Sequence, residues 1–76
     1  MVSFTFTSIQ ILKALADRSR LRIVNSLMEQ PRYVEELSKR LNLAASTVSF
    51  HLKKLEEADL VESRKEQYYV VYHLKE

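Results

Sequence analysis

Residues 41–58 read LNLAASTVSFHLKKLEEA, and their pattern predicts an amphipathic helix from Ala45 to Ala58. Leu52 and Leu55 lie within about 40° of Val48 on a helical wheel, so these three side chains form an apolar stripe. The opposite stripe carries four other side chains: Ser46, Phe50, Lys53 and Glu57. We expect this helix to pack through its apolar stripe and to present the other stripe to solvent or to a partner.

A shorter helix is expected just before it, roughly from Tyr33 to Leu41, with Val34 and Leu37 facing inward. Asn42 follows this helix at a position that favours the left-handed backbone conformation. Only residues 42–44 then separate the two helices. This spacing is typical of a helix-turn-helix unit.

The helix before that unit has signals at both ends. Asp17 is a favoured N-cap residue, and Pro31 pushes the residue before it away from the helical conformation. Leu21, Val24 and Met28, with Ile23 and Leu27 beside them, repeat at helical spacing between these signals and are expected to form the stripe that faces the core. These signals predict a helix from about Arg18 to Glu29.

The N-terminal segment predicts one more helix. Thr7 and Gln10 have the spacing of a capping box and predict a helix from about Ser8 to Ala16. Residues 1–6 alternate apolar and polar side chains, so we expect them to form a short extended arm.

The C-terminal part of the chain changes period. Leu60–Lys65 and Tyr68–Leu74 are rich in β-branched and aromatic residues and alternate as strands do. Glu66 and Gln67 lie between them, so we expect a hairpin, although neither residue favours the positive φ of a two-residue turn. A hairpin after a helix-turn-helix is a wing. The predicted fold is therefore mainly α, a winged helix-turn-helix with four helices followed by two strands.

Length and composition limit the class of protein. The 76 residues, 46% of them hydrophobic, are expected to form one domain over residues 1–76. The chain has no cysteine, which excludes disulfides and thiolate ligands. It has no apolar run of about 18 residues and no secretory signal pattern, so we expect a cytoplasmic protein. A net charge of +2 and a pI of 9.0 permit a nucleic-acid partner without requiring one.

Several segments of the chain resemble the ArsR family of bacterial and archaeal winged-helix repressors. Residues 12–24, LKALADRSRLRIV, resemble the family's opening LKALADPTRLRIL. Residues 41–55 resemble LGLSQSTVSHHLKVL, residues 57–61 resemble EAGLV, and residues 64–72 resemble the family's wing, RREGRWVYY. The matches are in order and cover about residues 11–74. The resemblance implies a nucleoid-associated repressor that binds a pseudo-palindromic double-stranded operator as a homodimer.

The chain departs from the family pattern at its glycines and at one cap. Asn42, Asp59 and Gln67 stand where the family has glycine. Asn and Asp tolerate positive φ, whereas Gln does not, so we expect a different turn at the tip of the wing. Ala44 stands where the family has a serine before the recognition helix, which removes the side-chain cap.

The resemblance also bears on metal sensing. Family members that sense arsenic, cadmium or lead carry a cysteine pair in the third helix, whereas this chain has no cysteine. Family members that sense zinc or nickel use ligands on a helix after the wing, and the sequence stops at Glu76 without one. His73 alone is expected to be a structural strand residue. We therefore expect no metal and no other cofactor.

The exposed stripe and the resemblance together predict the DNA-contacting residues. A major groove about 12 Å wide admits one helix, so residues 45–58 are expected to enter it. Hydroxyl groups would contact phosphates or base edges, and Phe50 would contact a thymine methyl. The cationic side chains would contact phosphates. The predicted set is Ala45, Ser46, Thr47, Ser49, Phe50, Lys53, Lys54, Arg64, Lys65 and Arg32. Phe50 alternatively packs on another protein chain or is a tolerated exposed apolar side chain. His51 and Arg20 are expected to have structural roles.

The first helix and the arm before it carry more apolar surface than one face needs. We expect four of these residues to form a dimer interface: Phe4, Phe6, Ile9 and Leu12. The alternative is that they cover the domain's own core. A dimer would place two recognition helices about 34 Å apart, the separation of successive major grooves.

Two functions compete at this stage. The first is a sequence-specific DNA-binding transcriptional regulator. The second is a winged-helix docking module that binds protein and not DNA, because fold does not determine function. An enzyme is not expected, since the sequence has no nucleophile–base set and no phosphate-binding glycine loop.

Overall fold

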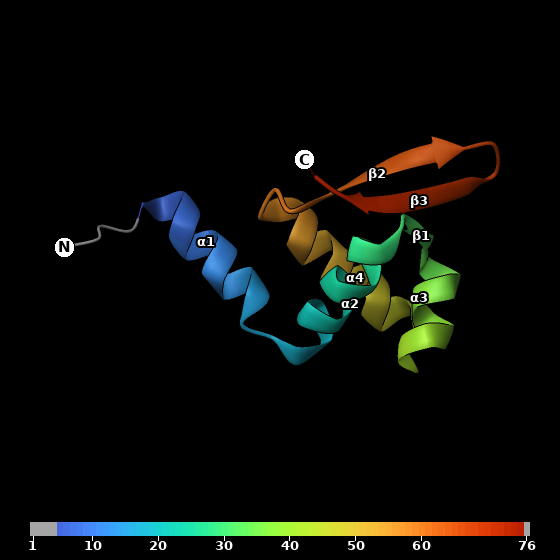
Figure 1. The fold of residues 1–76 in the computed structure, drawn as a ribbon, viewed down its shortest axis with the longest axis horizontal. Helices are drawn as coiled ribbons and strands as arrows, with labels where there is room; N and C mark the ends of the chain where they lie inside the picture. The colour runs from blue at the N-terminus through green and yellow to red at the C-terminus, as the bar shows by residue number, and fades with distance from the viewer. Residues whose placement is uncertain (1–4, 76) are drawn as a thin grey trace.

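The computed structural model describes residues 5–75, which form four helices and a three-stranded sheet (Figure 1). The elements in chain order are α1 (Phe6–Leu15), α2 (Arg18–Glu29), β1 (Arg32–Tyr33), α3 (Val34–Leu41), α4 (Ala45–Glu57), β2 (Val61–Glu66) and β3 (Tyr69–Leu74). The sheet lies along one side of α2, α3 and α4, while α1 extends away from them. This is the predicted winged helix-turn-helix, with one strand that the sequence did not predict.

The start of α1 differs from the prediction. The Ser8 N–H donates to Thr5 Oγ1 at 3.2 Å, so Thr5 rather than Thr7 is the N-cap. Both threonines are favoured caps, and α1 uses the earlier one because the Ile9 N–H also closes a turn on the Thr5 carbonyl at 3.0 Å. Phe6 is therefore the first residue of α1 and not part of an extended arm. Phe4 lies outside the described residues.

The helix-turn-helix forms as predicted, with α3 and α4 separated by residues 42–44. Asn42 has φ 55° and ψ 49°, which is the left-handed conformation expected at the end of α3. The start of α3 has a partial cap that the sequence reasoning missed, because the Tyr33 N–H donates to Glu36 Oε1 at 3.0 Å. Ala44 precedes α4 and offers no side-chain cap, as the departure from the family pattern predicted.

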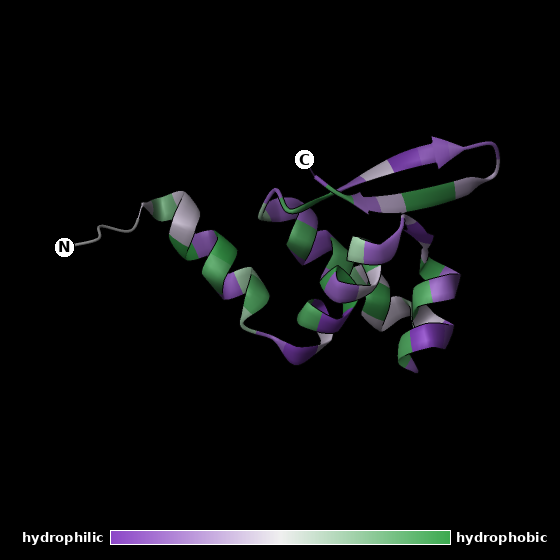
Figure 2. Cartoon of the chain, viewed as in Figure 1, coloured by the Kyte–Doolittle hydropathy of each residue, from purple (hydrophilic) through white to green (hydrophobic). Residues whose placement is uncertain are grey.

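The sheet has the order β1-β3-β2, and both pairs of strands are antiparallel. Its two-residue strand β1 pairs Arg32 with Tyr72 and Tyr33 with Val71. A strand this short has no periodicity to detect, and it exists because β3 leaves one edge free to accept it. The hydrophobic middle of β3 and the largely hydrophilic β2 are visible in Figure 2.

The wing turn is shifted by one residue from the prediction. Glu66 pairs with Tyr69, so the turn consists of Gln67 and Tyr68. Gln67 adopts φ 54°, so the expectation that Gln does not tolerate positive φ at this position is wrong. The left-handed conformation costs a non-glycine residue about 1–2 kcal/mol. The paired strands on either side hold Gln67 in it despite that cost.

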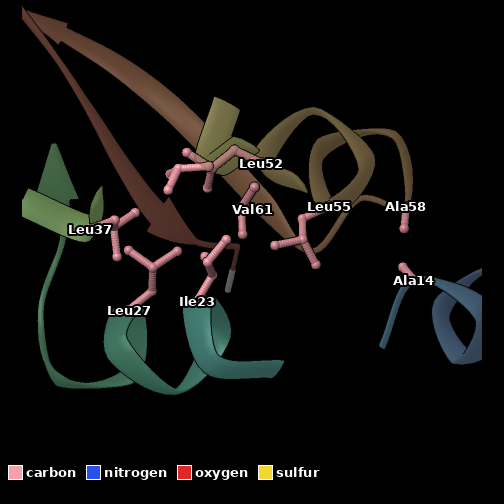
Figure 3. Close-up of a cluster of buried hydrophobic side chains, with 9 residues drawn as sticks. Ala14, Ile23, Leu27, Leu37, Leu52, Leu55, Ala58 and Val61 are labelled. Carbon is pink, nitrogen blue, oxygen red and sulfur yellow. The ribbon is translucent and has the colours of Figure 1, made fainter. Parts of the chain in front are cut away.

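The core lies between α2, α3, α4 and the base of the wing. Five large side chains are fully buried: Ile23, Leu37, Val48, Leu52 and Leu55. The prediction that Leu21 and Met28 face the core is wrong, because they are 50% and 69% exposed and α2 packs through Ile23 and Leu27 instead. Figure 3 shows side chains from these elements pointing toward one another, with Val61 of β2 among them. The predicted apolar stripe of α4 is thus confirmed as the side that holds the helix in place, which leaves the opposite side free.

The first helix contributes little to this core. Ala14 is its one buried residue among those described, and it faces Ala58 after the end of α4 (Figure 3). Apolar side chains nearer the N-terminus of α1 remain exposed. Figure 2 shows the hydrophobic residues of this projecting helix in green. No helix within residues 5–75 is both long enough and apolar enough to cross a bilayer.

Candidate nucleic-acid interface

The outer face of α4 is exposed from its first turn onward. Ser46, Ser49 and Lys53 are exposed, and Phe50 is 54% exposed. Thr47 is half-buried, because it lies at the side of the helix. The face therefore presents two hydroxyl groups, an aromatic ring and an ammonium group, directly opposite the stripe that anchors α4 in the core.

The Phe50 ring lies between two neighbouring side chains of α4. The His51 ring contacts it edge-on at 5.3 Å between centroids, and Lys54 Nζ lies 5.5 Å from its centroid. Lys54 also forms a 3.8 Å ion pair with Glu57. Phe50 further lines a shallow groove between α4 and α1, opposite Lys13. The Phe50 ring is therefore exposed to solvent, and it also borders the groove next to α1.

The cations of the wing are exposed. Arg64 donates from Nε and Nη2 to Glu66 Oε1 at 3.1 and 2.8 Å, two residues along the same strand. An exposed ion pair of this kind is worth about 0–1 kcal/mol, so a phosphate can replace the carboxylate. Lys65 is exposed, and Tyr68 at the wing tip is 94% exposed.

Tyr68 was expected to begin the second strand of the hairpin, which is wrong, because that strand begins at Tyr69. The one-residue shift of the turn carries its side chain out of the sheet. Tyr69 instead packs on Tyr33 of β1, with ring centroids 5.0 Å apart. No signal in the sequence distinguished the two tyrosines, because the turn position depends on strand register.

The structure contradicts the predicted role of Arg32. Its side chain is buried, and its guanidinium donates from Nε to the Ser26 carbonyl at 3.1 Å and from Nη2 to Glu29 Oε1 at 2.6 Å. Glu36 Oε2 lies 3.8 Å from Nη1. The formation of β1 turns this residue inward, so Arg32 holds α2 against β1 and is not available to a phosphate.

His51 and Arg20 form a partly buried polar contact, which agrees with their expected structural roles. Arg20 Nη1 lies 3.2 Å from His51 Nδ1, and Arg20 Nε lies 2.5 Å from the Ala14 carbonyl. Asp17 caps α2 by accepting from the Arg20 N–H at 3.0 Å. This hydrogen bond is the main reason that the pKa of the Asp17 carboxyl is below its ordinary value, with the charge of Arg20 contributing.

The apolar face of α1 is uncovered. Phe6 is 77% exposed, Leu12 53% and Ile9 42%. The alternative that these three side chains cover the domain's own core is therefore wrong. They remain free to pack against another surface.

Comparison with known proteins matches residues 17–63 to the family model of bacterial regulatory proteins of the arsR family. The chain belongs to the ArsR family. The match covers α2, the helix-turn-helix and the first half of β2. ArsR-family proteins are transcriptional regulators and not enzymes, as the sequence predicted.

Relatives of known sequence agree with this ArsR membership. An uncharacterised HTH-type transcriptional regulator of Methanocaldococcus jannaschii is 47% identical over 51 residues, which are 67% of this chain and 54% of that protein. The transcriptional activator HlyU of Vibrio cholerae is 42% identical over 67 residues, which are 88% of this chain and 62% of HlyU. This chain therefore spans little more than half the length of these two curated relatives.

Solved structures show the same ArsR fold. HlyU from Vibrio cholerae superimposes with a TM-score of 0.86 at 40% identity, over 92% of this chain and 76% of HlyU. A homodimeric winged helix-turn-helix DNA-binding domain from Mycobacterium bovis has a TM-score of 0.86 at 27% identity, over 97% of this chain and 75% of that domain. A transcriptional repressor from Xylella fastidiosa, BigR, has a TM-score of 0.83 at 32% identity, over 90% of this chain and 67% of BigR.

Membership in the ArsR family does not by itself imply a metal site in this chain. Within residues 5–75 no three His, Asp or Glu side chains come together as a group able to hold a metal ion. His73 lies on β3, where its Nδ1 is 3.1 Å from the Leu74 carbonyl.

Proposed function

We propose that this chain is the DNA-binding domain of a transcriptional regulator, and that it inserts α4 into the major groove of an operator. The observation that carries the proposal is the division of α4 into a fully buried stripe and an exposed face of hydroxyl, aromatic and ammonium groups. One α-helix fits a groove about 12 Å wide, and such a face offers hydrogen-bond, apolar and charged contacts to it.

The proposed contacts divide into two kinds. Ser46, Ser49 and Phe50, with Ala45 and Thr47 at the first turn, would lie against base edges and the nearest phosphates. Lys53, Lys54, Arg64 and Lys65 would neutralise phosphates, which adds affinity without sequence preference. Arg32 is no longer part of the set, because its guanidinium is buried and paired.

We propose that the domain works as a homodimer that packs through α1. The exposed Phe6, Ile9 and Leu12 support this, as does the homodimeric domain from Mycobacterium bovis with the same fold. Two copies related by a two-fold axis would place their recognition helices about 34 Å apart and read a pseudo-palindromic operator. Phe4 belongs to the same proposed interface.

Repression by occlusion is the proposed regulatory outcome. A dimer bound across two half-sites covers DNA that polymerase needs. One structural neighbour, BigR, is named a repressor, whereas HlyU is named an activator. Transcription in vitro from a template with the selected site at the promoter tests whether the protein represses. An increased amount of transcript would contradict repression and indicate activation.

The second candidate function is a docking module that binds protein rather than DNA. It is favoured by the low net charge of +2 and by the exposed Phe50 ring. An apolar side chain on an otherwise polar face can serve as an anchor for another protein.

Selection of bound sites from random duplex DNA distinguishes the two functions. We expect inverted repeats and, in solution, the mass of a dimer. Four cations per protomer predict a slope of about −7 for log affinity against log salt concentration, or about 10⁴-fold weaker binding at 200 mM than at 50 mM salt. Absence of duplex binding at low salt would favour the docking module.

A further inference from the structure

The attachment of α1 to the rest of the molecule is narrow. Among the described elements, α2 is the one that α1 contacts extensively. Beyond this, Ala14 meets Ala58 at the end of α4, and the helix then extends away from the body (Figure 1). Only Ala16 and Asp17 separate α1 from α2. Apolar packing alone therefore does little to define the angle between α1 and α4.

A single side chain bridges this junction. Arg20 Nε donates to the Ala14 carbonyl, one of the carbonyls at the end of α1 that no helical N–H can reach. Its Nη1 donates to His51 Nδ1 at 3.2 Å, and His51 is a buried residue of α4. The backbone N–H of Arg20 donates to Asp17 Oδ1, which caps α2. Arg20 thus joins the end of α1, the start of α2 and the middle of α4.

The chemistry of the contact determines the state of His51. A guanidinium can only donate hydrogen bonds, so His51 Nδ1 must accept and the ring proton must lie on Nε2. The Asp17 Oδ1 atom is farther from Nδ1, at 4.0 Å, and its charge balances that of Arg20. A side chain at position 51 therefore needs an acceptor at the place of Nδ1 to keep α4 tied to Arg20.

We infer that Arg20 and His51 are positioning residues that set the angle between α1 and α4, and so the separation of the two recognition helices in the dimer. The inference rests on the proposed function. Ten residues make α1 about 15 Å long, so a 20° tilt at the junction moves its far end by about 5 Å. That is more than the 3.4 Å rise of one base pair, and it acts on the face proposed for dimerisation.

Operator spacing provides the test. Affinity is measured for a single half-site, for the selected inverted repeat, and for the repeat with two base pairs inserted, which rotates one half-site by about 70°. We expect the insertion to weaken the affinity of the unmodified protein about tenfold or more. The insertion should weaken the affinity of Arg20→Met by less than about threefold, while the affinity of this variant for the single half-site is unchanged. Arg18→Met removes an exposed arginine of the same helix and should behave as the unmodified protein.

Variants at His51 separate positioning from general stability. His51→Asn keeps an acceptor near the place of Nδ1 and should keep the spacing preference. His51→Leu has no acceptor and should lose that preference as Arg20→Met does. If the spacing profiles of Arg20→Met and His51→Leu match that of the unmodified protein, the inference is overturned.

A distance measurement does not depend on DNA binding. Because the chain has no cysteine, Glu56→Cys on the exposed side of α4 gives one spin-label site per protomer. The distance distribution between the two labels of a dimer should be narrow in this background and at least about twice as broad with Arg20→Met. Failure of duplex binding alone would overturn the proposed function, whereas equal widths would overturn the inference. A monomeric mass would overturn both the proposed dimer and the inference.

Discussion

Phe50 and Lys53 lie on the same exposed face of α4 but would contribute different kinds of binding energy. The ring can only contact an apolar group of a base, such as a thymine methyl, which makes its contribution sequence-dependent. The ammonium group would meet a phosphate, which every sequence offers equally. The same face therefore has to be tested for specificity and for affinity separately.

Phe50→Ala should relax base preference at one position per half-site, with a loss of about 1 kcal/mol on the preferred sequence. Lys53→Ala should weaken binding to all sequences alike and reduce the magnitude of the salt slope by about one per protomer. Site selection and affinity against salt concentration measure both effects. An unchanged selected motif with Phe50→Ala would contradict the role assigned to the ring.

Arg32→Met should affect folding rather than DNA binding. It removes the hydrogen bonds to the Ser26 carbonyl and Glu29 from a buried position, so the free energy of unfolding should fall by about 1.5–3 kcal/mol. Arg40 also pairs with Glu29, at 3.3 Å, but is half-exposed, and Arg40→Met should cost less than about 1 kcal/mol. Urea denaturation measures both. A larger fall in the free energy of unfolding for Arg40→Met than for Arg32→Met would show that burial does not determine the contribution of these arginines.

Helix caps and turns are the features that decide single elements. The chain places Asn42, Asp59 and Gln67 in the left-handed conformation without any glycine. Asn and Asp accept this conformation readily, whereas Gln67 does so at a cost. The wing should therefore be the element that a single substitution improves most.

Gln67→Gly should stabilise the wing turn, raising the free energy of unfolding by about 0.5–1 kcal/mol, because glycine adopts positive φ without steric cost. Glu66→Gly is the matched control: it places the same residue type one position earlier, inside β2, where it should destabilise. Thermal unfolding of the two variants checks the sign. The same sign for both would show that the turn geometry is not responsible.

Asp17 makes the start of α2 sensitive to acid. Its folded-state pKa lies below the ordinary value of 3.8, mainly because the carboxylate accepts the Arg20 N–H. The stabilisation is therefore present above the ordinary pKa and is lost as the pH falls through the lowered folded-state value. Asp17→Asn keeps a capping oxygen but has no charge. Its free energy of unfolding, measured from pH 7 to pH 2.5, should lie below that of the unmodified protein at pH 7 and converge with it in acid.

At the scale of the whole molecule, the main feature is the exposed apolar face of α1. An exposed apolar face on a projecting helix is unfavourable in a lone domain, and a two-fold partner would remove the same surface from water twice. Association through α1 would also bring together two copies of the face of α4 that is proposed to contact DNA. Dimerisation and binding to a two-half-site operator would then both depend on α1.

Leu12→Asp should give a monomer that binds single half-sites with unchanged affinity and binds the inverted repeat at least about tenfold more weakly, since the two half-sites no longer act together. Leu21→Asp is the matched control, because Leu21 is 50% exposed and Leu12 53% exposed, and it should remain dimeric. Sedimentation or light scattering gives the masses. A dimer that survives Leu12→Asp and dissociates with Leu21→Asp would place the interface on α2.

Local signals in the sequence determined α2, the helix-turn-helix, the apolar stripe of α4 and the left-handed Asn42 and Asp59, because each depends on spacing or caps within a few residues. The exposed face of α4 followed from the same periodicity. The tertiary structure alone decided the strand β1, the inward turn of Arg32, the position of Tyr68 and the contact of Arg20 with His51. These features depend on strand register and on residues far apart in the chain, for which periodicity within one segment carries no information.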